Sequence, residues 1–169
     1  MNNEKIIDIG TQIVSKILDF PIPELYIIEQ SKLPNKEITG IYSFGENEII
    51  FNEEWVNRSQ WIEVIITVFH EMRHAYQGYC IRTKTRESAE TIKAWESEIN
   101  CYIMPSGKNN GIDDQSYLTQ EIEIDAIAFA HWIVKKEFDL KTVIPDLIKK
   151  KVNEKIKTFE IIGITQINL

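Results

Sequence analysis

The sequence predicts an α+β fold, with one helix, then a small antiparallel sheet, then several helices. Two observations support this prediction. Three short runs rich in β-branched and aromatic residues lie close together near the N-terminus, separated by turn-forming residues. Longer segments with apolar residues at helical spacing fill most of the remaining chain. The 169 residues, 1–169, are expected to form a single domain.

The N-terminal elements follow from periodicity and from helix-breaking residues. Isoleucines at helical spacing predict an amphipathic helix over 5–19, which Pro21 and Pro23 end. The β-type runs are 25–28, 38–44 and 48–51. Gly45-Glu46-Asn47 predicts a hairpin turn between the last two runs. The sheet and the helix that follows it are therefore expected to occupy about 22–80.

Most of the remaining chain is expected to be helical. The predicted helices cover about 60–78, 86–100, 116–137 and 145–158. Asn57 or Ser59 is expected to cap the first of these helices. Residues 104–114 have the composition of a loop, and the Ile-rich tail over 159–169 is expected to form a strand. The C-terminal helix and tail thus make up 138–169.

Composition argues against several classes of partner. A net charge of -7 and a pI near 5.1 disfavour binding to nucleic acid or to anionic membranes. The basic run over 149–157 is expected to be a solvated helix face. No apolar segment reaches the roughly 20 residues of a membrane span, and no secretory signal is recognisable. We therefore expect a cytoplasmic protein in which Cys80 and Cys101 are reduced thiols.

The segment His70-Glu71-Met72-Arg73-His74 is the most informative part of the sequence. It lies in the predicted helix over 60–78, where residues four apart share a face, so both imidazoles can bind one zinc ion. Glu71 lies about 100° round the helix from His70. From there its carboxylate can accept a proton from a zinc-activated water and act as a general base. Apolar β-branched residues flank this polar stripe, which is typical of a buried helix with one polar seam.

A catalytic zinc site needs a third protein ligand. Glu123 is the preferred candidate, because it shares a helix face with small alanines, where a carboxylate is costly unless something such as a metal ion pairs with it. Cys80 is an alternative, although Gln77 stands where the H-E-x-x-H-x-x-G-x-x-H pattern has glycine. His131 is another, although a lone histidine in an apolar helix is more often a core residue. We expect Zn²⁺ bound by His70, His74 and Glu123.

Together these motifs resemble those of the gluzincin metallopeptidases. His70-Glu71-x-x-His74, followed by Glu123-x-x-Ala126-x-x-Phe129-Ala130, is most similar to the ImmA/IrrE-type peptidases, which are small cytosolic enzymes. The resemblance covers roughly 38–134. It implies a compact zincin-like fold with a central active-site helix, and a later helix that supplies the glutamate ligand. It also implies hydrolysis of peptide bonds in a protein or peptide substrate, with Glu71 as the base.

Other residues are expected to complete the site. An edge strand commonly lines the cleft of zincins, and the run over 48–51 is the candidate because it directly precedes the helix. A tyrosine could donate a hydrogen bond to the transition-state oxyanion. The candidates are Tyr76, Tyr102 and Tyr117. Tyr117 is preferred because it lies in the segment that leads into the glutamate helix. Arg73 is expected to form an ion pair with Asp125 or Glu121.

The expected function is therefore that of a zinc-dependent metalloendopeptidase, and two alternatives remain open. One is a binding or regulatory protein with a zincin fold, related to toxin–immunity pairs or mobile elements, with structural metal or none. The intact Glu71 argues against it, because a structural site needs no base. The other alternative is a zinc hydrolase that acts on a non-peptide substrate.

Overall fold

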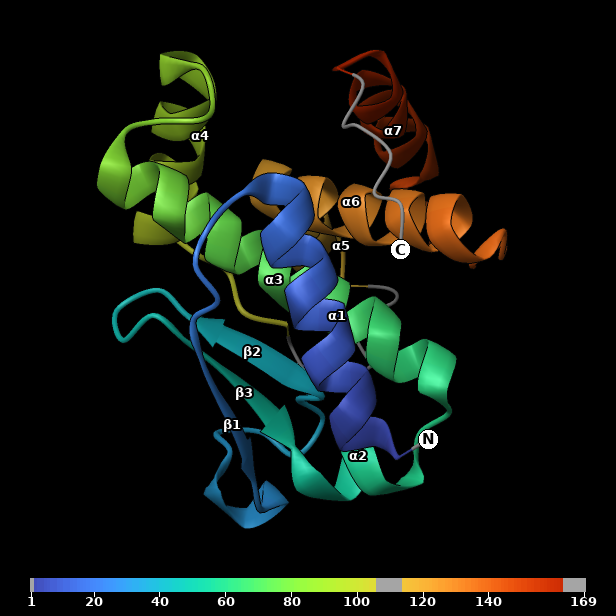
Figure 1. Ribbon diagram of the computed structural model, residues 1–169. Coiled ribbons are helices and arrows are strands. Elements are labelled where there is room, and N and C mark those ends of the chain that lie inside the picture. Colours follow the sequence, from blue (N-terminus) through green and yellow to red (C-terminus); the bar gives the residue numbers. More distant parts are fainter. Residues whose placement is uncertain (1, 106–113, 163–169) are drawn as a thin grey trace. The chain divides into compact units, whose positions relative to one another are not determined.

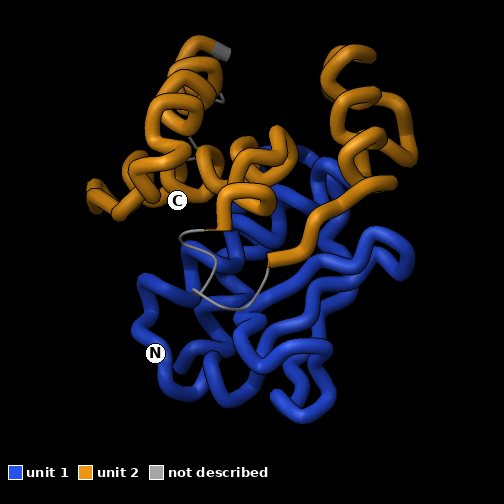
Figure 2. The backbone as a smooth tube through the Cα atoms, turned by 180° about the vertical axis from the view of Figure 1, so that it is seen from behind, with its two compact units in different colours: residues 1–78 blue, residues 79–169 orange. Residues whose placement is uncertain are grey.

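A computed structural model describes residues 2–105 and 114–162 and shows an α+β protein, mostly helical, with a small sheet (Figure 1). The predicted fold class is confirmed at this level. The chain divides into two compact units, residues 1–78 and 79–169 (Figure 2). The prediction of a single domain stays a prediction. Among the described residues, no helix is long and apolar enough to cross a membrane.

Helix α1, Asn3–Leu18, is close to the prediction for this segment. The side chain of Asn2 caps its first turn by accepting the N–H of Lys5. The helix ends at Asp19, which adopts the left-handed conformation common after a last helical turn. Pro21 and Pro23 follow this end, as expected, because they cannot continue a helix.

Gly10 allows α1 to pack closely on helix α3, Trp61–Thr83 (Figure 1). A Cβ atom added at Gly10 would lie 2.7 Å from side-chain atoms of both Ile65 and Val68. These two side chains are buried on α3. The missing side chain therefore sets the distance between the two helices, and α1 covers part of the helix that carries the H-E-x-x-H motif.

The sheet is mixed, which corrects the expected antiparallel sheet. Its strands are β1 (Glu24–Ile28), β2 (Gly40–Ser43) and β3 (Glu48–Asn52). Their order is β1-β3-β2, with β1 parallel to β3 and β2 antiparallel to it. The central strand is β3, so the prediction that 48–51 is an edge strand is wrong. A central position suits this strand because its apolar residues Ile49 and Phe51 are fully buried.

The predicted hairpin between β2 and β3 is confirmed. Asn47 adopts a positive φ of 57°, which asparagine tolerates better than most residues. Its backbone N–H donates to the carbonyl of Ser43 at 2.9 Å, and its side-chain oxygen accepts the hydroxyl of Tyr42, also at 2.9 Å. These bonds close the turn and fix the register of β2 on β3.

A short helix that the sequence did not predict precedes α3. Helix α2, Glu53–Arg58, is capped by the Asn52 side chain, which accepts the N–H of Trp55. Asn57 lies inside α2, and Ser59 is its C-terminal boundary, so neither residue caps α3 as expected. Instead, the carboxylate of Glu63 accepts the backbone N–H of Gln60, the residue before α3, at 2.8 Å.

The second unit is helical in its described residues. Its elements after α3 are α4 (Ala89–Asn100), α5 (Gln115–Leu118), α6 (Glu121–Phe138) and α7 (Lys149–Ile162). The helix expected over 116–137 is interrupted at residues 119–120, where Gln120 is extended. Residues 159–162 are helical rather than a strand, and the rest of that predicted strand lies outside the described residues. So does most of the predicted loop over 104–114.

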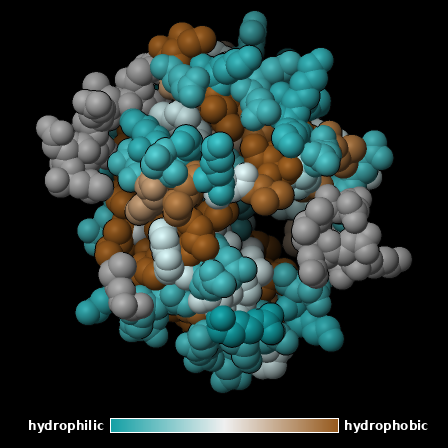
Figure 3. All heavy atoms as spheres, turned by 90° about the vertical axis from the view of Figure 1, so that its right-hand side faces the viewer, coloured by the Kyte–Doolittle hydropathy of each residue, from teal (hydrophilic) through white to brown (hydrophobic). Residues whose placement is uncertain are grey.

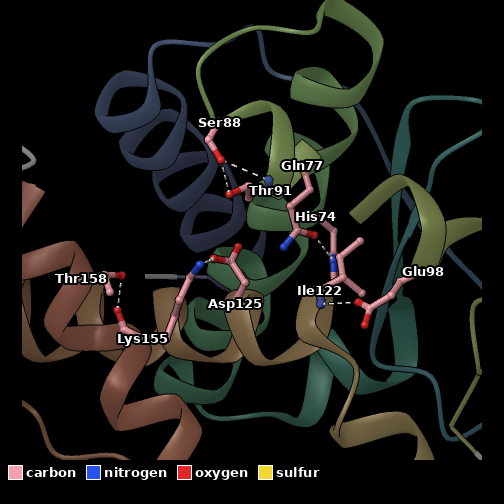
Figure 4. Close-up of polar contacts among 9 residues, drawn as sticks. All are labelled: His74, Gln77, Ser88, Thr91, Glu98, Ile122, Asp125, Lys155 and Thr158. Carbon is pink, nitrogen blue, oxygen red and sulfur yellow. Dashed lines mark hydrogen bonds and ion pairs between the residues drawn. The ribbon is translucent and has the colours of Figure 1, made fainter. Parts of the chain in front are cut away.

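Helix α7 packs against α6 through an aromatic cluster and two ion pairs (Figure 1). The rings of Phe129, Trp132 and Phe159 lie 5.6 to 5.9 Å apart between centroids. Lys151 pairs with Glu121 at 3.0 Å. Lys155 pairs with Asp125 at 2.9 Å, as Figure 4 shows. The basic run is thus more than a solvated face, because two of its lysines hold α6. The expected pairing of Arg73 with one of these acids stays a prediction.

Hydrophilic residues cover much of the face in Figure 3, with hydrophobic patches between them. In the second unit, large apolar side chains are exposed in and beside the segment that connects α6 to α7. These are Phe138, Leu140, Val143 and Leu147.

Candidate metal centre

Helix α3 places the two histidines of the motif against each other. Their Nε2 atoms lie 3.0 Å apart, and their ring centroids are separated by 4.6 Å with the planes almost perpendicular. This is the result expected from a spacing of four residues on a helix. Two neutral imidazoles at this distance share a proton, because one Nε2–H can donate to the lone pair of the other. The same two nitrogens can both act as ligands when a cation replaces that proton.

Gln77 orients the second histidine. Its amide oxygen lies 2.8 Å from Nδ1 of His74 (Figure 4). An amide oxygen only accepts, so Nδ1 carries the proton and Nε2 keeps its lone pair. Both side chains are buried, and Gln77 has no exposed surface. Metal-binding histidines commonly donate their second N–H in this way, which fixes the ring and its tautomer. The signal in the sequence was the place of Gln77 on the polar stripe of the helix.

Glu71, the proposed base, is buried where β2 meets α3. Only 6% of its surface is exposed. A Cβ atom added at Gly40, the first residue of β2, would lie 3.1 Å from Cγ of Glu71 and 2.9 Å from Cγ2 of Thr67. Just beyond the other end of β2, the ring of Phe44 meets the His74 ring edge-on, with centroids 6.2 Å apart. The edge strand that runs along the motif is therefore β2, in place of the expected β3.

Glu123 lies in the first turn of α6 and has no exposed surface. Its Oε1 atom accepts a hydrogen bond from the hydroxyl of Tyr102 at 2.5 Å. A hydroxyl donor of this kind offsets part of the cost of removing a carboxylate from water. The carboxylate is thus fixed in a buried position by a residue from the segment after α4.

The start of α6 is held by two further side chains. Glu98, from α4, accepts the backbone N–H of Glu121 at 2.9 Å. It also accepts the N–H of Ile122 at 2.7 Å (Figure 4). Gln120 forms two hydrogen bonds with the backbone of Ile103, donating to its carbonyl at 3.0 Å and accepting its N–H at 2.9 Å. The bonds of Gln120 thus connect Ile103, the residue after Tyr102, to the start of the helix that carries Glu123. The sequence did not reveal these roles, because each contact spans 17 to 24 residues.

Among the described residues, His70, His74 and Glu123 form a group of possible metal ligands. One ligand atom from each lies within 4.8 Å of the others. Two imidazole nitrogens and one carboxylate oxygen are an established ligand set of catalytic zinc sites, which leaves a position for water. The donor chemistry of these residues therefore fits a zinc ion.

The alternative ligands do not belong to this group. His131 is half-buried on α6, and its Nδ1 forms a hydrogen bond with the Thr142 hydroxyl. Cys80 is a buried cysteine on α3. Neither is among the clustered ligands that the described part of the chain contains.

The candidate tyrosines have different surroundings. Tyr76 belongs to the core, where it packs edge-on against Phe20 at 5.6 Å and lies under the guanidinium of Arg73 at 4.7 Å. Tyr117, in the short helix α5, meets the ring of Tyr102 edge-on at 6.4 Å. The preferred tyrosine thus lies beside the one that binds Glu123, and its catalytic role stays a prediction.

Comparisons with known protein families, with characterised proteins and with solved structures find no match to this chain. The resemblance to the ImmA/IrrE-type peptidases therefore stays an expectation based on the two motifs.

Proposed function

We propose that this protein is a zinc-dependent metallopeptidase. His70, His74 and Glu123 would hold the ion, and Glu71 would be the general base. The observation that carries the proposal is the group of three ligands of suitable chemistry. A buried carboxylate, Glu71, directly follows the first ligand in the same helix. A purely structural site has no need of such a carboxylate.

Each residue would have a distinct part in the reaction. Bound zinc would supply a water of lowered pKa and polarise the substrate carbonyl. The carboxylate of Glu71 would take a proton from the attacking water and deliver it to the leaving nitrogen. Gln77 would keep the His74 ring fixed through its Nδ1–H. Tyr117 is the proposed donor to the oxyanion that develops on the carbonyl.

The position of β2 favours a protein or peptide substrate. β2 lies at an edge of the sheet and runs along the helix that carries Glu71 and His74. An extended peptide can add to such an edge through backbone hydrogen bonds, which brings a peptide bond close to the side chains beside the strand. We propose β2 as the strand that aligns the substrate.

The test compares wild type with Glu71→Gln, using zinc analysis and a library of quenched fluorescent peptides. We expect about one zinc per chain in both proteins. Removal of the base should lower the rate of hydrolysis by roughly 10²- to 10⁴-fold. Glu96→Gln is the matched control, because Glu96 is an exposed acid paired with Lys84, and it should change neither property.

Two results would contradict the proposal. Full peptidase activity in Glu71→Gln would exclude Glu71 as the base. A wild-type protein that contains no zinc and does not respond to a chelator would favour a binding protein with a zincin fold.

A further inference from the structure

We propose that Tyr102 is a positioning residue that orients Glu123 for metal binding. This inference rests on the proposed function, because Glu123 is one of its three ligands. The sequence alone makes Tyr102 a candidate oxyanion donor, and this inference assigns it a different role.

The first argument is the hydrogen-bond capacity of the phenol. A tyrosine hydroxyl has one hydrogen to donate, and here it goes to Oε1 of Glu123 at 2.5 Å. A hydroxyl committed to a buried carboxylate cannot also donate to a substrate oxygen. Breaking the bond during the reaction would leave a charged oxygen without this donor inside the protein, which is costly. Tyr102 is therefore suited to act through Glu123.

The second argument concerns the geometry that the bond imposes on the carboxylate. Holding Oε1 fixes the rotation of the carboxyl plane and directs the ligand role to the other oxygen. That second oxygen, Oε2, is also buried. Outer hydrogen bonds of this kind are a general feature of metal sites, where they orient the carboxylates that act as ligands. We infer that Glu123 binds zinc through Oε2.

The third argument is that the surrounding structure holds the phenol and the carboxylate in place. The two hydrogen bonds between Gln120 and Ile103 fix the residue next to Tyr102 to the residue that precedes α6. Glu98 holds the first N–H groups of α6, two residues or fewer from Glu123. Hydrogen bonds from residues next to Tyr102 and next to Glu123 thus hold the phenol and the carboxylate in place. Ligands held in advance lose less entropy when the metal binds.

The experiment measures zinc affinity in Tyr102→Phe, by competition with a chromogenic chelator. We expect the Kd for zinc to rise about 10- to 100-fold. The melting temperature of the metal-free protein is recorded in parallel, and the visible spectrum of the Co²⁺-loaded protein should change if the carboxylate turns. The matched control is Tyr26→Phe, because Tyr26 also donates to a glutamate, Glu24, at 2.5 Å, but at an exposed site on β1. This control should keep wild-type zinc affinity.

A second variant, Glu123→Gln, tests whether Tyr102 acts through the glutamate. Tyr102→Phe should cause no further loss of affinity in a Glu123→Gln background, since the residue it positions has already been changed. An additional loss of similar size in that background would overturn the inference. Unchanged zinc affinity in Tyr102→Phe would also overturn the inference and would indicate a direct role of Tyr102 in the reaction. Tighter zinc binding would overturn it as well, because the hydrogen bond from Tyr102 to Glu123 would then oppose metal binding.

The same variants separate this inference from the proposed function. If Glu123→Gln binds zinc as tightly as wild type, the proposed ligand set fails. If Glu123→Gln weakens zinc binding and Tyr102→Phe does not, the ligand set stands and only the role of Tyr102 fails.

Discussion

Replacing Gly40 with alanine tests how closely β2 must approach the motif helix. The new Cβ would lie 2.9 Å from Cγ2 of Thr67, 3.1 Å from Cγ of Glu71 and 3.3 Å from Cδ1 of Phe51. Ordinary van der Waals contacts begin at 3.4 Å, so the closest neighbour must give way by about half an ångström. Overpacking of this kind costs about 1 to 3 kcal/mol. At about 2–4 °C per kcal/mol for a chain of this length, the melting temperature should fall by roughly 2 to 12 °C.

The same substitution should also lower activity, because the new methyl group would lie 3.1 Å from Cγ of Glu71 and push the side chain that carries the carboxylate. A displacement of about 1 Å at a catalytic group can reduce the rate by about 10²-fold. The assays are urea unfolding for the free energy and peptide hydrolysis for the rate. Gly45→Ala is the matched control, since a Cβ there would meet nothing within 4 Å, and it should leave both properties near wild type.

A second change identifies the contact responsible. Thr67→Ser removes the methyl group nearest to the new Cβ, so the cost of Gly40→Ala should be smaller in that background. The reasoning is refuted if Gly40→Ala matches Gly45→Ala in stability and in rate. It is also refuted if the cost is the same with threonine and with serine at position 67.

Two further predictions concern the residues that support the candidate ligands. Gln77→Leu removes the acceptor for Nδ1–H of His74 and should raise the Kd for zinc about 10- to 100-fold. Gln77→Glu keeps an acceptor and should bind zinc well. Equal zinc affinity of the two variants in chelator competition would argue against this role of Gln77. Glu98→Ala leaves two N–H groups of α6 without their acceptor and should lower the free energy of unfolding by about 0.5 to 2 kcal/mol. Glu96→Ala, which removes an exposed ion pair with Lys84, should cost about 0.5 kcal/mol or less in the same urea titration.

The helical elements were predictable to the extent that their signals are local. The start of α1 depends on a cap from Asn2 and on isoleucines that repeat within the helix itself. The H-E-x-x-H pattern is also local, because the helix alone brings residues 70 and 74 together. The interruption before α6 was missed, since Gln120 makes its bonds to Ile103 rather than to its neighbours in the sequence.

The pairing of β3 with β1 could not be predicted, because no local property of β3 specifies that partner. Its apolar residues indicated a strand, but the parallel partner β1 lies about twenty residues earlier in the chain, at 24–28. A run such as Ile49-Ile50-Phe51 suits a central strand, and its nearness to α3 led to the wrong prediction of an edge. The hairpin to β2 was predictable because its turn is short and contains Asn47.

The candidate site shows the same division between ligands and their supports. Few residue types can bind zinc, so His70, His74 and Glu123 stand out from the sequence. Many residue types can accept or donate one hydrogen bond, so the sequence does not reveal that Gln77, Tyr102 and Glu98 support the ligands. Their roles depend on distances that only the folded chain sets, which are 2.8 Å for Gln77 and 2.5 Å for Tyr102. Zinc affinity is therefore the most discriminating measurement. Replacing a ligand and replacing the residue that supports it should each lower the affinity. The two losses should be additive only where the two substitutions act on different ligands.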